Sequence, residues 1–182
     1  MQIPLSQPDI NERDRAAVME VLTSGALSLG PKVPEFERTV AALTGSRHAV
    51  AVNRGTSALH LCVKSAGIRK RDEVITTPFS FVASANSILF ERGRPVFVDV
   101  DPATYNIDPK AIEVATTPAT RAILAVHVFG RPCEIGEIRT IAEDHGLELI
   151  EDACEAIGAT YQGKAVGSFG SSGTFAFIPT SS

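Results

Sequence analysis

Residues 146–159 read GLELIEDACEAIGA, and the rest of the sequence can be interpreted outward from this stretch. Residues 147–150 are a short apolar run compatible with a β-strand, and Glu151 and Asp152 follow it directly. Ligands of parallel α/β sheets bind beyond the carboxyl ends of the strands. A carboxylate with little around it to solvate its charge needs a cationic partner there. The sequence therefore raises the question of which cation Asp152 meets.

The flanking sequence alternates between expected strands and expected helices. Strands are expected at 48–52, 73–76, 95–98, 121–128 and 147–150, and helices at 13–22, 34–43, 56–66, 82–90, 109–115 and 134–145. A small polar hairpin at 161–166 and a final strand at 173–177 follow. Repeated β-α-β alternation predicts an α/β fold with three layers (αβα), in which helices cover both faces of a mostly parallel sheet. We find no linker or repeat, so residues 1–182 are expected to form one domain.

Composition excludes several classes of partner. The chain has 182 residues and a net charge of -4, and its Lys and Arg residues are scattered, which argues against nucleic acid or an anionic membrane as partner. The N-terminus lacks the features of a signal peptide, and no apolar run is long enough to span a bilayer. The three cysteines, Cys62, Cys133 and Cys154, show no CxxC spacing. This pattern predicts neither a disulfide framework nor a metal site, and it favours a reducing cytoplasm.

The turn NRGTSA at 53–58 joins an expected strand to an expected helix. Thr56 and Ser57 offer hydroxyls and backbone N–H groups at a helix N-terminus, where the helix dipole favours an anion such as phosphate. The turn matches neither the P-loop nor the dinucleotide fingerprint, which argues against an unrelated Rossmann-type protein. The alternative interpretation is that Thr56 or Ser57 is only an N-cap.

Two aromatic residues alternate where the strand 73–76 ends. Phe79 and Phe81 lie in TPFSFVASAN, residues 77–86. An aromatic face at this position could stack on a flat heterocycle. The alternative is that both rings belong to the core.

Asp152 also has two interpretations. It could cap a following helix, because Glu155 stands at the spacing of a capping box. It could instead bind a protonated ring nitrogen, with Glu155 nearby. His127, at the end of the expected strand 121–128, would then share the crevice of Asp152 as a supporting residue.

A phosphate turn, a stacking ring and a carboxylate for a ring nitrogen are the features that pyridoxal 5'-phosphate requires. Together with the ordered motifs that span the chain, they give a resemblance to a known family. The motifs are SGALSLGPKVPEFE, NRGTSALHL, TTPFSFVASANSILF, PVFVDVDPATYNIDP, AVHVFGRPCEI, LIEDACEAIGATYQGKAVGSFG and TFAFIPT. The sequence resembles the DegT/DnrJ/EryC1/StrS family of sugar aminotransferases, which depend on pyridoxal 5'-phosphate and have the aspartate-aminotransferase (type I) fold.

The resemblance implies a role for each candidate residue. Thr56 and Ser57 match the positions that hold the cofactor phosphate, and Phe81 matches the aromatic residue that stacks on the ring. Asp152 matches the carboxylate that pairs with the pyridine nitrogen and keeps it protonated. Glu155 stands where many members have Gln, near the ring hydroxyl, and a carboxylate there would repel a phenolate oxygen unless one of them carries a proton.

The sequence departs from the family pattern at two further positions. Ala176 replaces a serine that binds phosphate in some members, and Ser181 stands where the family has its Schiff-base lysine. A serine hydroxyl cannot form an imine with the cofactor aldehyde. The resemblance therefore assigns no catalytic residue to this chain. It implies the N-terminal part of a truncated large domain, without the small C-terminal domain.

The resemblance implies a transfer of an amino group from an amino acid, by resemblance glutamate, to a keto group of a nucleotide-linked sugar. Because the lysine is missing, we expect the 182-residue chain itself to be inactive. The alternative is a non-catalytic protein of the same fold that binds at most cofactor or a partner. A homodimer is expected, since the active sites of this family are built at a subunit interface.

Overall fold

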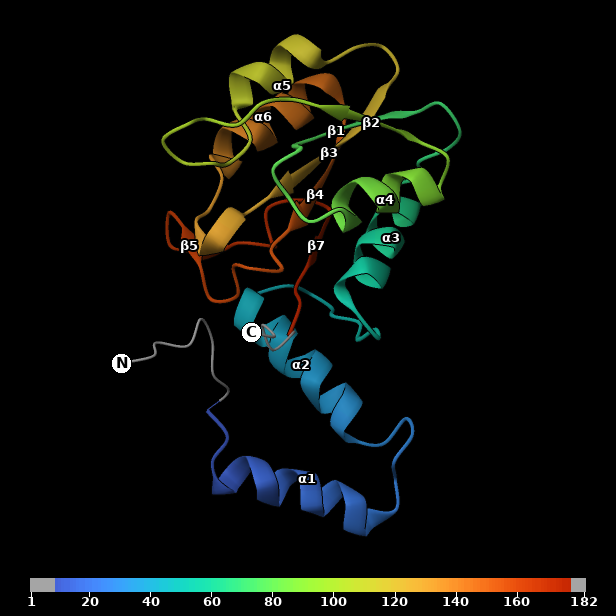
Figure 1. Cartoon of the computed structure of the whole chain (residues 1–182), viewed down its shortest axis with the longest axis vertical. Coiled ribbons are helices and arrows are strands. Elements are labelled where there is room, and N and C mark those ends of the chain that lie inside the picture. Colours follow the sequence, from blue (N-terminus) through green and yellow to red (C-terminus); the bar gives the residue numbers. More distant parts are fainter. Residues whose placement is uncertain (1–8, 178–182) are drawn as a thin grey trace, which may run out of the picture.

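A five-stranded parallel sheet forms the centre of the computed structural model, which describes residues 9–177 (Figure 1). Its strands are β1 (Glu73–Thr76), β2 (Arg94–Phe97), β3 (Thr120–Val126), β4 (Glu148–Asp152) and β7 (Ser172–Thr174). They lie in the order β2-β1-β3-β4-β7, and every neighbouring pair is parallel. The expected mostly parallel sheet is therefore confirmed.

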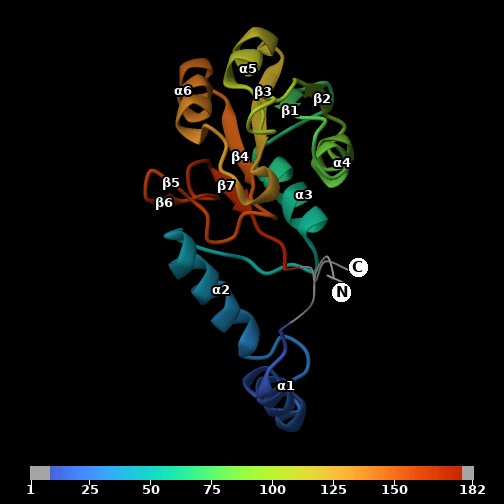
Figure 2. The ribbon, with the colours of Figure 1, turned by 60° about the vertical axis from the view of Figure 1, so that its left-hand side comes forward.

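Helices cover both faces of this sheet, which confirms the three layers (Figure 2). The helices α3 (Gly55–Ser65) and α4 (Ala83–Phe90) lie on one face, and α5 (Pro109–Ala115) and α6 (Ile135–His145) lie on the other. Successive side chains of a strand point to opposite faces. In β3, Leu124 accordingly packs in the cluster that includes Leu59 of α3, whereas Ile123 packs with Ile138 of α6.

The same alternation separates the two carboxylates at the end of β4. Ile150 packs with the α3 and α4 side chains, and Leu149 packs with those of α5 and α6. Asp152 therefore points to the α3–α4 face, and Glu151 points to the α5–α6 face. Two consecutive residues thus enter two different environments.

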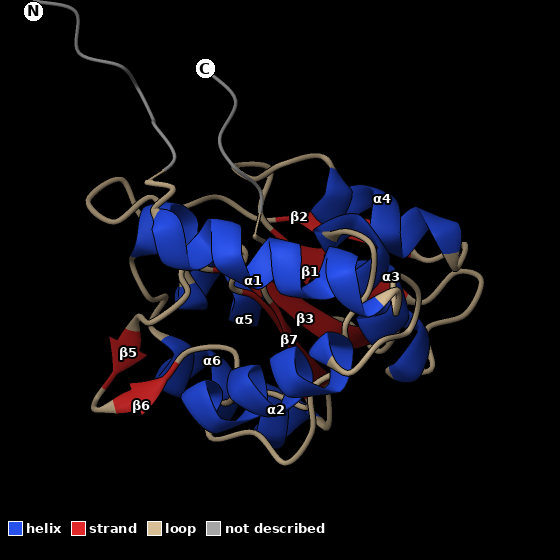
Figure 3. Ribbon diagram, turned by 90° about the horizontal axis from the view of Figure 1, so that it is seen from below, coloured by secondary structure: helices blue, strands red, loops and turns tan. Residues whose placement is uncertain are grey.

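The two N-terminal helices lie beyond one end of the sheet (Figures 1 and 3). They are α1 (Glu12–Ser24) and α2 (Lys32–Thr44), and each ends at a glycine in the left-handed conformation, Gly25 and Gly45. The expected hairpin is also present as β5 (Thr160–Tyr161) and β6 (Lys164–Ala165). A short 3-10 turn, η1 (Val128–Gly130), follows β3.

The prediction of a strand at residues 48–52 is wrong. Val50 is 77% exposed, and the N–H of Ala51 donates to the side chain of Glu37 at 2.9 Å. A groove of about 1060 Å³ is lined both by this segment and by β7. A β-strand needs a neighbour for its N–H and C=O groups, and within the described residues 9–177 this apolar segment has none.

Among the sheet strands only β1 has the predicted bounds, and β2 is shifted by one residue. β3 ends at Val126 because His127 leaves the extended conformation, with φ -89° and ψ 88°. β4 extends through Glu151 and Asp152, and β7 ends at Thr174. In the described part of the chain, no helix is long and apolar enough to cross a bilayer.

Candidate functional site

Asp152 lies at the carboxyl end of β4 and is 6% exposed. Its Oδ2 accepts a hydrogen bond from Ser84 Oγ at 3.0 Å, and its Oδ1 accepts one from the Cys154 N–H at 3.2 Å. The described residues 153–177 contain no α-helix, so the interpretation of Asp152 as a helix cap is wrong. A carboxylate has about four lone-pair sites, so Asp152 retains capacity to accept from a cationic N–H group.

Phe81 lies in the loop between β1 and α4 and is 76% exposed. Phe79 is 42% exposed, with its ring 5.7 Å from that of Tyr105 and 6.0 Å from that of Phe129. The interpretation of both rings as core residues is therefore wrong. Phe81 offers an open aromatic face close in sequence to Ser84, the residue that contacts Asp152.

The N-terminus of α3 begins at Gly55, with Thr56 and Ser57 as its second and third residues. The N-cap residue is Arg54, and among the described residues it makes no side-chain capping bond. The alternative interpretation of Thr56 or Ser57 as the N-cap is therefore wrong. The free N–H groups of such a terminus, together with the helix dipole, favour an anion.

This helix terminus lies directly against the residues that follow β4 and β7. A Cβ atom added to Gly55 would lie 3.2 Å from Cys154 Sγ and 3.4 Å from Ala176 Cβ. Burial, and then the charge of Asp152, raise the pKa of the Cys154 thiol to about 12. The turn at Thr56 and the carboxylate of Asp152 therefore share the same edge of the sheet.

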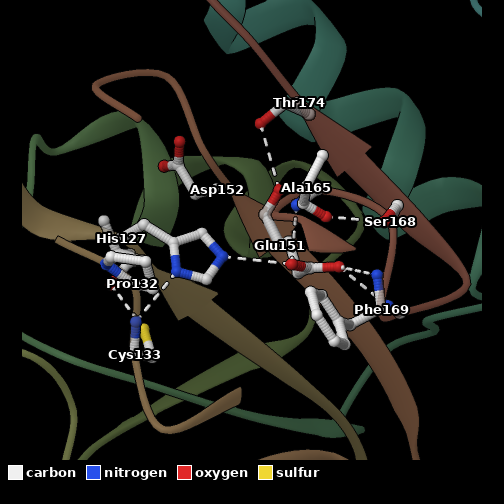
Figure 4. Close-up of polar contacts among 12 residues, drawn as sticks. His127, Pro132, Cys133, Glu151, Asp152, Ala165, Ser168, Phe169 and Thr174 are labelled. Atoms are coloured by element: carbon white, nitrogen blue, oxygen red, sulfur yellow. Dashed lines mark hydrogen bonds and ion pairs between the residues drawn. The ribbon is translucent and has the colours of Figure 1, made fainter. Parts of the chain in front are cut away.

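His127 belongs to a different cluster (Figure 4). Its Nε2 lies 3.1 Å from Glu151 Oε2, and its Nδ1 accepts from the Cys133 N–H at 3.0 Å. Because Nδ1 accepts, the ring proton is on Nε2 and is donated to Glu151. The expectation that the His127 side chain shares the crevice of Asp152 is wrong, since the ring is fully buried against Glu151.

Glu151 is the centre of that cluster. Besides His127, its carboxylate accepts from the N–H groups of Gly167 at 2.7 Å, Phe169 at 2.6 Å and Gly170 at 2.8 Å. Burial tends to raise the pKa of this carboxyl, but the hydrogen bonds from His127 and the backbone outweigh it and leave the pKa below its ordinary value. Figure 4 shows Asp152 pointing away from these contacts. The sequence prediction gave Glu151 no role, although strand alternation and the glycine-rich GSFGSSG could have indicated one.

Glu155 is exposed, and its Oε2 accepts from the Phe129 N–H at 2.9 Å. Phe129 has φ 52°, in the left-handed region, so this contact supports a strained turn. The capping-box interpretation is wrong, and a contact of Glu155 with a cofactor stays a prediction.

Ser181 lies outside the described residues. Within residues 9–177, no three His, Cys, Asp or Glu side chains gather as a metal site would require.

Comparison with known proteins places these features in one family. The family model described as the DegT/DnrJ/EryC1/StrS aminotransferase family matches residues 8–182. The chain belongs to this family. Its fold is the large domain of the pyridoxal-phosphate-dependent aminotransferases, and the chain covers about half the length of the solved structures that it matches.

Individual relatives match almost all of this chain. The spore coat polysaccharide biosynthesis protein SpsC of Bacillus subtilis is 45% identical over 98% of this chain and 46% of its own length. GDP-perosamine synthase of Caulobacter vibrioides is 42% identical over 97% of this chain and 48% of its own. A solved structure of a putative sugar aminotransferase from Streptococcus pneumoniae, in its PMP form, superposes with a TM-score of 0.94 at 29% identity, over 98% and 49% of the two chains. The chain thus spans about half the length of these relatives.

Proposed function

We propose that the edge formed by α3, Phe81 and Asp152 binds pyridoxal 5'-phosphate. The observation that carries the proposal is the environment of Asp152, a nearly buried carboxylate with one hydrogen bond to each oxygen and spare acceptor capacity. A helix N-terminus, whose dipole favours an anion, lies at the same edge. A cofactor with a phosphate at one end and a protonated ring nitrogen at the other matches both charges.

Each residue has a proposed task. The backbone N–H groups at the start of α3, with the Thr56 and Ser57 hydroxyls, bind the phosphate, and the Phe81 ring covers one face of the pyridine. Asp152 accepts the ring N–H and thereby holds the proton on the nitrogen. When bound, the cofactor supplies a protonated ring that withdraws electrons from the carbon at which the amino group is exchanged. Glu155 lies near the ring hydroxyl in this proposal.

We propose further that the whole protein transfers an amino group from an amino acid, glutamate, to a keto group of a nucleotide-linked sugar. The support is family membership and relatives such as a GDP-perosamine synthase and a sugar aminotransferase in its PMP form. A second copy of the chain would complete the assembly as a homodimer. In α1, whose residues are all described, none is buried, and Val18, Met19 and Leu22 remain exposed for such a contact.

One feature favours a second, narrower function for the 182-residue chain alone. Ser181 cannot bind the cofactor covalently, so the chain would bind it reversibly and without turnover. In this proposal the chain is a cofactor-binding protein, and the aminotransferase reaction belongs to relatives that carry the lysine.

Two experiments test these proposals. Fluorescence titration with pyridoxamine 5'-phosphate should show saturable binding, which Asp152→Ala abolishes while the far-UV circular dichroism is unchanged. Borohydride treatment with pyridoxal 5'-phosphate should leave no pyridoxyl group on residue 181, whereas Ser181→Lys should gain one, detectable by peptide mass spectrometry. Absence of saturable binding would overturn the cofactor site, and a reducible adduct in the unsubstituted chain would overturn the non-covalent interpretation.

A further inference from the structure

Two serine hydroxyls connect Asp152 to the surface. Ser84, in the first turn of α4, is 1% exposed, and its Oγ donates to Asp152 Oδ2 at 3.0 Å. Ser80 Oγ lies 2.8 Å from Ser84 Oγ. The described structure thus contains a chain of hydroxyls, Ser80 to Ser84 to Asp152, that begins at a half-buried residue and ends at the carboxylate.

The direction of these hydrogen bonds depends on the charge of Asp152. A serine hydroxyl has one proton to donate, and an ionised carboxylate can only accept. Ser84 therefore uses its proton for Asp152, and Ser80 must donate to Ser84. The order of donors from Ser80 to Ser84 to Asp152 thus provides a hydrogen bond for each acceptor along the chain of hydroxyls.

The same two residues also fix the loop that carries Phe81. The Ser84 N–H donates to the Phe81 carbonyl oxygen at 3.1 Å, so one residue contacts both the aromatic residue and Asp152. A shift of Ser84 would move Phe81 and Asp152 relative to each other. The serine pair thus links the two proposed cofactor contacts, which lie far apart in the sequence.

We infer that Ser84, supported by Ser80, is the positioning residue that aims Asp152 at the ring nitrogen of the bound cofactor and keeps their shared proton on that nitrogen. This inference rests on the proposed function, because the proton concerned is the one shared between the pyridine nitrogen and Asp152. While Ser84 donates to the carboxylate, the carboxylate is a weaker base and the proton stays on the ring nitrogen. Without that donor, the proton moves toward Asp152 and the ring loses positive charge.

The experiment uses pyridoxamine 5'-phosphate labelled with ¹⁵N in its ring, because the ¹⁵N chemical shift reports directly whether the nitrogen is protonated. The unsubstituted chain should give a pyridinium-like signal. Ser84→Ala should move the signal toward the neutral pyridine position and weaken binding by about tenfold, the loss expected for one hydrogen bond to a charged group. Ser80→Ala should move the signal in the same direction by a smaller amount.

Ser87→Ala is the matched control, because Ser87 is equally buried in α4 but donates to the Ser84 carbonyl oxygen and not to Asp152. Its ¹⁵N signal should stay pyridinium-like. An unchanged signal in Ser84→Ala would overturn this inference while leaving the cofactor site intact, and an equal shift in Ser87→Ala would also overturn it. Absence of binding by the unsubstituted chain would overturn the proposed cofactor site and this inference with it.

Discussion

Glu151 and Asp152 are adjacent carboxylates on one strand, yet their surroundings have opposite character. Glu151 points to the α5–α6 face, is fully buried and accepts from four N–H donors. Asp152 points to the α3–α4 face and accepts from two donors. A carboxylate that has saturated its acceptor sites holds a structure together, whereas one with acceptor sites to spare can bind a ligand. The number of donors, more than burial, distinguishes the two roles.

The N–H groups that donate to Glu151 also explain how β7 is positioned. Gly167, Phe169 and Gly170 belong to the loop that leads to β7, and their N–H groups converge on this one carboxylate. β7 then pairs with β4, with Asp152 opposite Thr174. Glu151 therefore orders the loop from one face of the sheet, and the strand that results borders the proposed site on the other.

Glu151→Gln should produce the largest effect. In one orientation of the Gln side chain, its NH₂ group faces two donors, His127 Nε2–H and the Gly167 N–H. In the other orientation, the NH₂ group faces the N–H groups of Phe169 and Gly170. Leaving buried donors unpaired in this way should lower the free energy of unfolding by about 3 kcal/mol or more. Urea denaturation followed by circular dichroism measures the change.

Glu148→Gln is the control, because Glu148 begins the same strand but is exposed. It should change the free energy of unfolding by less than about 0.5 kcal/mol. Equal effects of the two substitutions would contradict the structural role assigned to Glu151.

The second prediction concerns how the difference in unfolding free energy between the unsubstituted chain and Glu151→Gln depends on pH. The hydrogen bonds hold the pKa of Glu151 below its ordinary value of 4.5, so the ionised carboxylate stabilises the folded state above that pH. This contribution is lost as the pH falls through the lowered pKa, since protonated Glu151 then resembles Gln. The difference in unfolding free energy between the unsubstituted chain and Glu151→Gln should therefore shrink on acidification. A difference independent of pH would show that the charge of Glu151 is not what stabilises the loop.

Asp152→Asn makes the same chemical change one residue later, and its expected effect is on binding. The Asn oxygen can still accept one of the two hydrogen bonds, and the Ser84 hydroxyl can rotate to accept from the amide, so stability should fall by less than about 1 kcal/mol. Affinity for pyridoxamine 5'-phosphate should fall at least about tenfold, because a neutral amide does not pair with a pyridinium. Isothermal titration calorimetry measures this, and an unchanged affinity would separate Asp152 from the ring nitrogen.

The sequence predicted the layers of the fold because periodicity in strands and helices follows from burial alone. It predicted correctly that Asp152 lies at the carboxyl end of a sheet strand, and ligand binding at that edge stays a prediction. It wrongly predicted a strand at 48–52, because pairing depends on a neighbour and not on composition: HAVAV has strand-like residues, but the groove beside it leaves its N–H and C=O groups without a strand partner in the described chain.

Contacts between side chains that are distant in the sequence were also not predicted correctly. His127 directly follows β3, but the one-residue alternation at Glu151 and Asp152 determines which carboxylate it meets, and the prediction paired it with the wrong one. The alternation of side chains along a strand, with its period of two residues, could have corrected this pairing. The contact from Ser84 to Asp152 spans 68 residues and depends on how α4 packs, which no local pattern encodes.

Substitution of Glu155 has the smallest expected effect. It tests whether the turn next to the proposed cofactor site is part of that site. In the structure its carboxylate supports Phe129, whose left-handed backbone places an exposed aromatic ring beside Phe79. Glu155→Gln keeps an oxygen for the Phe129 N–H, so unfolding should change by no more than about 0.5 kcal/mol. If Glu155 also lies near the ring hydroxyl, removing its charge relieves repulsion and should tighten binding of pyridoxamine 5'-phosphate by about threefold. The same fluorescence titration measures it, and an unchanged affinity would confine Glu155 to supporting the turn and leave the ring hydroxyl to other residues.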